Sequence, residues 1–259
     1  MTPAYYLRRT WSDFLAALQF LTRIPVPEQP YEPDSLVRAV KFFPLVGLLI
    51  GMGAAALHLI LGPHLPRLAA AVLVLLYLVF ITGCLHEDGL ADSADGFGGG
   101  TSRERILLIL RDSRIGSYGG IALALSLISR VVLLASLPLA QITSYLITAH
   151  VLCRWTTLPL SYFLASARPA LQNQPNGQGV RIARLTSTPT LIGGTIFSFA
   201  IAIVLLKTNA IAPILSAIAF TALTATYYKR RIGGVTGDCF GATNQLSEIG
   251  VYLCGAWIR

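Results

Sequence analysis

The chain has 259 residues, of which 54% are hydrophobic and 12% are charged, and it carries a formal net charge of +8. Soluble domains average about 25% charged residues, so this composition, with a mean hydropathy of +0.64, excludes an ordinary soluble protein and indicates a multi-pass membrane protein. No soluble basic domain carries the positive charge, so we expect no binding to nucleic acid.

The N-terminal third is expected to contain one interfacial segment and two membrane spans. Residues 11–24 are amphipathic but too few to cross a bilayer, which takes about 20 residues, so we place them at the membrane interface. The first span is predicted at residues 42–61, where Gly47 and Gly51 form a small-residue seam for close helix packing. The second span, residues 68–86, ends in an acidic stretch.

The rest of the chain alternates polar connections with apolar runs. A capping-box pattern, Thr101-Ser-Arg-Glu104, opens a short helix predicted at residues 103–112. A polar loop is expected at residues 168–188. The predicted fold class is an all-α, polytopic membrane helix bundle in one domain, residues 1–259, with about seven transmembrane helices plus short interfacial helices. Its further spans are predicted at residues 118–137, 142–165, 190–206, 210–227 and 239–257.

The acidic stretch, residues 86–100, carries the strongest functional pattern. Asp88, Asp92 and Asp95 follow one another at i, i+4 and i+7, which places them within roughly 60° on one helix face. Their charges repel, and at a helix C-terminus the dipole opposes them as well. A divalent cation reverses both effects, and Mg²⁺ prefers such oxygen ligands. The alternative is a solvated acidic helix end, and Glu87, about 100° away, is expected at its rim.

Arginines supply candidate anion-binding groups. Arg111 and Arg114 flank Asp112, a pattern suited to bidentate guanidinium contacts with an anionic ligand; the alternative is ordinary juxtamembrane positive charge. Arg130 and Arg154 fall inside predicted spans, where charges are costly and commonly functional. We expect Arg154 to act in the site and Arg130 to pair with a carboxylate of a neighbouring helix.

A glycine-rich loop opens the last predicted span and resembles an anion site at a helix N-terminus. Gly237 and Asp238 start this helix, and the structural alternative for Asp238 is an N-cap. Gly241, Gln245 and Glu248 share one face at i, i+4 and i+7. Glu248 lies nearly three turns into the span, so we expect it to be functional.

Lysine and arginine residues predict the orientation. Most of the 20 fall on the side that holds the N-terminus and the acidic stretch, so the positive-inside rule places that stretch in the cytoplasm. The residues alone thus favour a cytoplasm-facing cavity for Mg²⁺-dependent transfer of a phosphoryl or prenyl group from a diphosphate. The alternatives are another membrane transferase, such as a CDP-alcohol phosphotransferase or an aromatic prenyltransferase, and an ion-coupled transporter.

Five motifs occur in an order that resembles the bacterial cobalamin synthase (adenosylcobinamide-GDP ribazoletransferase) family, over nearly the whole chain. The family's last motif often has glutamate where this chain has Gln245, which leaves Glu248 as the acid of that helix. The motifs are Leu21-Thr-Arg-Ile-Pro-Val-Pro27, Phe43-Pro-Leu-Val-Gly47, His86-Glu-Asp-Gly-Leu-Ala-Asp-Ser-Ala-Asp-Gly96, Arg111-Asp-Ser-Arg-Ile-Gly116 and Gly237-Asp-Cys-Phe-Gly-Ala242.

The resemblance implies an enzyme of the bacterial inner (cytoplasmic) membrane that joins adenosylcobinamide-GDP to α-ribazole or its 5′-phosphate. The implied products are adenosylcobalamin or its 5′-phosphate and GMP, and the implied metal is Mg²⁺. No prediction of oligomeric state follows.

The predicted roles within such a site follow from the candidates above. Asp95 is predicted as the general base, with metal ligation as its main alternative role. The remaining assignments are metal ligation by Asp88, Asp92 and Glu248, further catalytic roles for Asp92 and Asp112, and substrate binding by Arg111, Arg114, Arg154, Gly237, Asp238 and His86.

Overall fold

The computed structural model describes residues 3–27, 35–112, 114–168 and 186–257. Within them every named element is helical, and one isolated parallel bridge joins Ser166 to Val235, so the predicted all-α class is confirmed. The helices are α1 (Pro3–Leu21), α2 (Ser35–Ala39), α3 (Phe43–Leu61), α4 (Arg67–Thr82), α5 (Leu85–Gly99), α6 (Arg103–Ile109), α7 (Ser117–Ser136), α8 (Ile142–Trp155), α9 (Thr157–Phe163), α11 (Thr188–Leu206), α12 (Ile211–Ile232) and α13 (Gly237–Trp257), with short 3₁₀ turns η1 (Val40–Phe42), η2 (Leu139–Gln141) and η3 (Lys207–Ala210).

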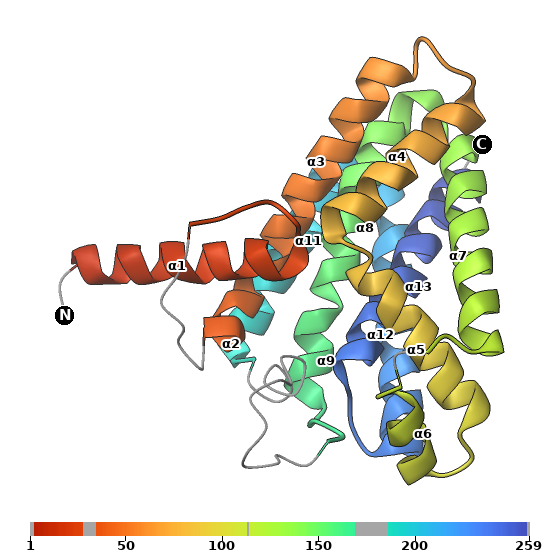
Figure 1. The fold of residues 1–259 in the computed structure, drawn as a ribbon. Coiled ribbons are helices and arrows are strands. Elements are labelled where there is room, and N and C mark those ends of the chain that lie inside the picture. The colour runs from red at the N-terminus through yellow and green to blue at the C-terminus, as the bar shows by residue number, and fades with distance from the viewer. Residues whose placement is uncertain (1–2, 28–34, 113, 169–185, 258–259) are drawn as a thin grey trace.

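The long helices form a bundle in which α3 packs along α8 (Figure 1). The predicted glycine seam makes this approach possible. A Cβ at Gly47 would lie 2.1 Å from the carbonyl oxygen of His150, and one at Gly51 would lie 2.7 Å from the Cα of Ile147. Neither position can therefore accept a side chain unless the helices separate.

Three helical segments of the described chain are long and apolar enough to cross a membrane: Ser35–Leu61, Ser117–Ser136 and Thr188–Ile232. A fourth follows if the bent pair α4 and α5 counts as one span. These segments match the first and third predicted spans and contain the fifth and sixth. The predicted number of seven spans stays a prediction.

The second predicted span does not continue into the acidic stretch. The helix ends at Thr82, Gly83 and Cys84 adopt left-handed φ angles of 62° and 61°, and α5 starts at Leu85 at an angle of 87° to α4. The placement of the acidic stretch at a helix C-terminus was therefore wrong. It forms a helix of its own whose first turn holds Glu87 and Asp88, where the dipole favours negative charge.

The fourth predicted span, residues 142–165, is also broken. The helix α8 ends at Trp155, and α9 starts at Thr157 with Pro159 in its first turn. A proline there has no N–H for a continuous helix, which explains the break. Most of the predicted polar loop, residues 168–188, lies outside the described residues.

The first helix lies across the bundle and projects from its side (Figure 1). It covers Pro3–Leu21, so it is longer than predicted, and its inner face buries Leu15, Ala17 and Leu21. Buried Asp13 of this face accepts hydrogen bonds of 2.9 Å from both Arg38 and Lys41. These contacts fix the C-terminal half of α1 to the bundle.

Candidate active site

Two of the sequence motifs meet where α5 crosses α13. A Cβ at Gly89 would lie 2.9 Å from the carbonyl oxygen of Asp238 and 3.1 Å from the Cα of Gly241. Since only glycine tolerates such close approach of two backbones, the acidic motif and the glycine-rich motif are packed directly against each other.

A cavity of about 220 Å³ opens beside this crossing. Its wall combines carboxylates and glycine backbone from α5 and α13 with aromatic and aliphatic side chains from α1 and α3. The lining residues are Phe20, Leu21, Phe43, Leu85, His86, Asp88, Gly89, Thr157, Gly237, Asp238, Phe240 and Gly241.

Acidic side chains from two helices share this region. Asp92 interacts electrostatically with Asp88, Asp95 and Asp238, and with the cation Arg168. Asp238 accepts hydrogen bonds from Arg168 at 3.3 Å and from Thr236 at 3.1 Å. It lies in the first turn of α13, one residue beyond its start at Gly237, so the alternative of an N-cap was wrong.

These carboxylates are oxygen donors of the kind that Mg²⁺ takes. The carboxylates of Asp88 and Asp92 make no hydrogen bond to another described residue, and one cation faces several acids, so the donor set fits a divalent ion. The three predicted ligands of the stripe nevertheless do not bring three carboxylate oxygens within 4.8 Å of one another in the described chain.

Asp95 contacts the start of α7, and neither Asp95 nor Asp92 is one of the residues that line the cavity. Its two oxygens accept hydrogen bonds from the backbone N–H groups of Gly116 at 2.7 Å and Gly119 at 2.9 Å. It therefore caps the N-terminus of α7 and ties the loop 111–116 to the acidic helix. The prediction that Asp95 is the general base stays a prediction. Both of its carboxylate oxygens already accept hydrogen bonds that cap α7.

The loop between α6 and α7 carries an exposed ion pair. Arg114 donates to both oxygens of Asp112 at 2.6 to 3.2 Å, and these hydrogen bonds lower the pKa of Asp112 to about 2. The exposed side chain of Arg111 has no hydrogen bond or ion pair with a described residue. Of the two arginines, Arg111 is the one whose guanidinium is free for a ligand within this part of the chain.

A buried charge network lies between α5, α7 and α13. Arg130 donates to Glu87 at 2.7 Å, to Glu248 at 2.9 Å and to Gln245 at 3.0 Å. The predicted pairing of Arg130 with a carboxylate is confirmed. Glu87 is 6% exposed, so its placement at the rim was wrong. Glu248 is bound to Arg130 here, whereas its predicted metal ligation stays a prediction.

Arg154 is 2% exposed and has no ion pair with a described residue. Its guanidinium bonds to His150 Nδ1 at 3.0 Å and to Cys153 Sγ at 3.2 Å, and its Nε has no partner in the described chain. His150, Cys153 and Glu248 bring their ligand atoms within 4.8 Å of one another. Because a guanidinium already occupies two of these three groups, we do not interpret them as a metal site.

Comparison with known proteins shows which protein family this chain is related to. Residues 13–256 match the family described as cobalamin-5-phosphate synthase. The adenosylcobinamide-GDP ribazoletransferase of Azorhizobium caulinodans is 43% identical and covers 96% of this chain and 97% of its own length. The enzyme of Sinorhizobium medicae is 39% identical over 95% of this chain and 96% of its own length. The enzyme of Vibrio cholerae is 36% identical over 96% of this chain and 95% of its own length.

The chain belongs to the cobalamin-5-phosphate synthase family. No solved structure matches it. The family resemblance of the sequence rested on five motifs, and four of them contribute to the cavity. Their lining residues are Leu21, Phe43, His86, Asp88, Gly89, Gly237, Asp238, Phe240 and Gly241. The fifth, residues 111–116, is attached to the acidic helix through Asp95.

Two groups of this family member were missed as site residues. Glu87 was set aside because it lies off the aspartate stripe, although a buried Arg130 called for an acidic partner. Arg168 belongs to none of the motifs, yet it is the cation that contacts Asp238. Its position at the start of a polar loop gives no sequence signal of that contact, which depends on the bridge that joins Ser166 to Val235.

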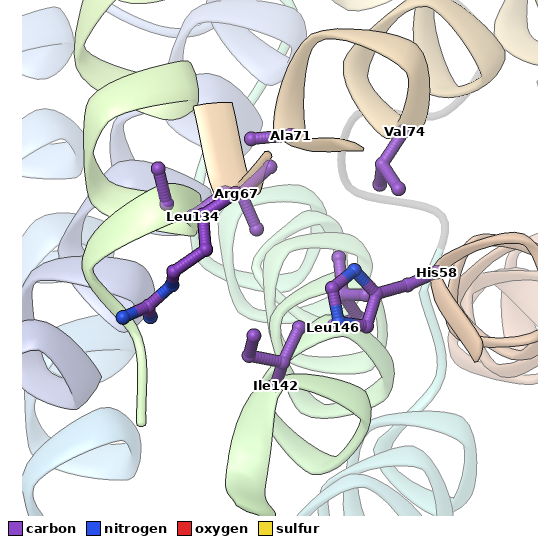
Figure 2. A pocket seen from close by; sticks show the side chains of 8 residues that line it. His58, Arg67, Ala71, Val74, Leu134, Ile142 and Leu146 are labelled. Atoms are coloured by element: carbon purple, nitrogen blue, oxygen red, sulfur yellow. The ribbon is translucent and has the colours of Figure 1, made fainter. Parts of the chain in front are cut away.

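A second, much smaller pocket lies at the opposite end of the bundle, near the connection of α3 to α4 (Figure 2). Its volume of about 10 Å³ admits at most one water molecule. Arg67 lies beside Leu134 there and donates to the carbonyl of Leu137, which ends α7. This pocket is a helix-capping region and has no room for a substrate.

Proposed function

We propose that the chain is an adenosylcobinamide-GDP ribazoletransferase. In this reaction a ribose hydroxyl of α-ribazole, or of its 5′-phosphate, attacks the donor phosphorus attached to the cobinamide arm. The bond from that phosphorus to GMP breaks, and the products are adenosylcobalamin, or its 5′-phosphate, and GMP. The observation that carries the proposal is the cavity at which four motifs of a member of this family converge.

In the proposed site Asp88 and Asp238 would hold Mg²⁺, and Asp92 would be a third ligand in the alternative that it is not the general base. When bound, the ion neutralises charge on the diphosphate and polarises its phosphorus–oxygen bonds. The three carboxylates come from facing helices that glycines hold in close contact, so the acids are brought together before any substrate arrives. Glu248 contributes by holding Arg130 in the network beneath α5.

The arginines at the mouth suit the anionic donor. Arg111 is exposed and free within the described chain, and Arg168 already contacts Asp238 at the cavity, so both can bind phosphate oxygens in bidentate fashion. Arg114 reaches the donor if it leaves Asp112. Arg154 acts from a deeper position, since it is buried beside the network, whereas buried His86 binds a substrate group at the cavity wall.

A carboxylate must accept the proton of the attacking hydroxyl. Asp92 is half-buried and free of hydrogen bonds to other described residues, whereas both oxygens of Asp95 bind the start of α7. We therefore assign the base to Asp92 ahead of Asp95. Asp112 takes part only by controlling Arg114.

We further propose that the cavity faces the cytoplasm of a bacterial inner membrane. The support is the asymmetry of lysine and arginine residues. Reporter fusions in the loop 168–188 and after Arg259 should give opposite signals if seven spans are present. Equal signals would show that one predicted span does not cross.

The decisive test of the function uses purified protein in sealed liposomes with donor, acceptor and Mg²⁺. We expect GMP release that requires both organic substrates and no ion flux across the vesicle. A transporter would give flux without GMP, and a prenyltransferase or CDP-alcohol phosphotransferase would release a different product. Either result would overturn the proposal.

A further inference from the structure

One wall of the 220 Å³ cavity is aromatic and has no part in holding an anion or a metal. Phe20 of α1, Phe43 of α3 and Phe240 of α13 line it, with Leu21 and Leu85 beside them. The rings of Phe20 and Phe43 stack on each other with centroids 5.7 Å apart and planes 15° from parallel. Aromatic side chains assembled from three helices around an open space form a surface on which a flat ring system can pack.

The cavity also holds a polar side chain without a partner. His86 is 6% exposed and lines the same cavity, and its imidazole makes no hydrogen bond with any other described residue. A neutral imidazole offers one donor and one acceptor, and both are available to a ligand in the cavity. A ligand with one or two ring heteroatoms would satisfy it.

We propose that this aromatic wall binds the base of the acceptor nucleoside, a flat and weakly polar fused heterocycle, with His86 contacting a ring nitrogen. This inference rests on the proposed function and deepens it by assigning a subsite. Asp88 and Asp238 line the same cavity. A base packed on the rings therefore presents its ribose to the carboxylates, where the hydroxyl must react.

The donor fits this wall poorly. Guanine is also flat, but several donors and acceptors lie on its edges. Against the three phenylalanines and two leucines most of them would stay unpaired, because the carboxylates of the same cavity, Asp88 and Asp238, are assigned to Mg²⁺ in the proposed site. The corrin macrocycle requires more room, because a volume of 220 Å³ is below the roughly 300–1,000 Å³ of pockets that enclose whole drug-sized ligands. The acceptor base is the substrate part that matches both the size and the chemistry.

The test compares two phenylalanines of α1. Phe20 lines the cavity, whereas Phe14 is also half-buried but does not line it and packs edge-on against Phe42. For Phe20→Ala we expect the KM of the acceptor to rise about 10- to 100-fold with the KM of the donor unchanged. For Phe14→Ala we expect neither KM to move. Phe20→Leu keeps an apolar side chain without a ring, so it supplies the same test if the alanine variant fails to fold.

The acceptor itself supplies a second readout. The wild-type protein should prefer ribosides of fused two-ring bases over imidazole riboside, and Phe20→Ala should remove most of that preference, which a loss of folding would not do. A rise in the KM of the donor instead, or an unchanged preference, would overturn the inference. Absence of GMP release by the wild-type protein would overturn the proposed function, so the two failures are distinguishable.

Discussion

Replacing Arg130 by methionine should be among the most destabilising single changes in this protein. The guanidinium is 2% exposed and serves two carboxylates, Glu87 and Glu248, whose side chains are 9% and 2% exposed. Removing one partner of a buried ion pair typically costs about 3–5 kcal/mol, because the remaining charge stays buried without compensation. Arg130→Met leaves two such charges, so we expect a loss at the upper end of this range.

The assay is reversible unfolding in mixed micelles of a mild detergent and sodium dodecyl sulfate. Arg114→Met is the control, since it removes an exposed arginine from an ion pair with Asp112, and it should leave the unfolding midpoint almost unchanged. Adding Glu87→Gln and Glu248→Gln to Arg130→Met removes the stranded charges and should restore most of the stability. If Arg130→Met lowered the free energy of unfolding by less than about 1 kcal/mol, or if the triple variant showed no recovery, the interpretation of a water-excluded network in which Arg130 compensates both glutamates would be refuted.

Three further predictions concern the site. Asp88→Asn and Asp92→Asn should each lower turnover at least about 100-fold while the protein still folds, and near-normal turnover of Asp92→Asn with its Mg²⁺ dependence intact would contradict its role. Asp95→Ala should lower the free energy of unfolding by about 1–2 kcal/mol through loss of the α7 cap; unchanged stability would mean that the cap contributes nothing. Gly89→Val should separate α5 from α13 and abolish turnover. Gly120→Ala in α7 should be tolerated, because an added Cβ there meets no atom within 4 Å. Equal loss of turnover in both variants would contradict the argument that α5 and α13 must approach closely at Gly89.

Long apolar segments were predictable because a bilayer demands about 20 consecutive apolar residues. The spans expected at residues 42–61 and 118–137 match α3 with its preceding turn and α7 within a residue or two. The break after Thr82 was not predictable, since it needs a left-handed Cys84, a conformation that a non-glycine residue adopts rarely. The break at Trp155 had a signal that was overlooked, namely Pro159 in the predicted span.

The candidate site was predictable where its residues lie close in sequence. The aspartate stripe and the glycine-rich loop stood out as local patterns, and α5 and α13 bring Asp88 and Asp238 to one cavity. Contacts between distant segments had no such signal. The hydrogen bonds from Gly116 to Asp95 and from Arg168 to Asp238 depend on how the helices pack, which a pattern in one segment does not reveal.

The most direct measurement of the central claim follows one oxygen atom through the reaction. The acceptor is supplied with ¹⁸O in the attacking ribose hydroxyl, and both products are analysed by mass spectrometry. If that hydroxyl attacks the phosphorus on the cobinamide arm, the label stays in the corrinoid product and the GMP released in equal amount carries none. Label in the guanine nucleotide, or a corrinoid product formed without GMP, would contradict the account.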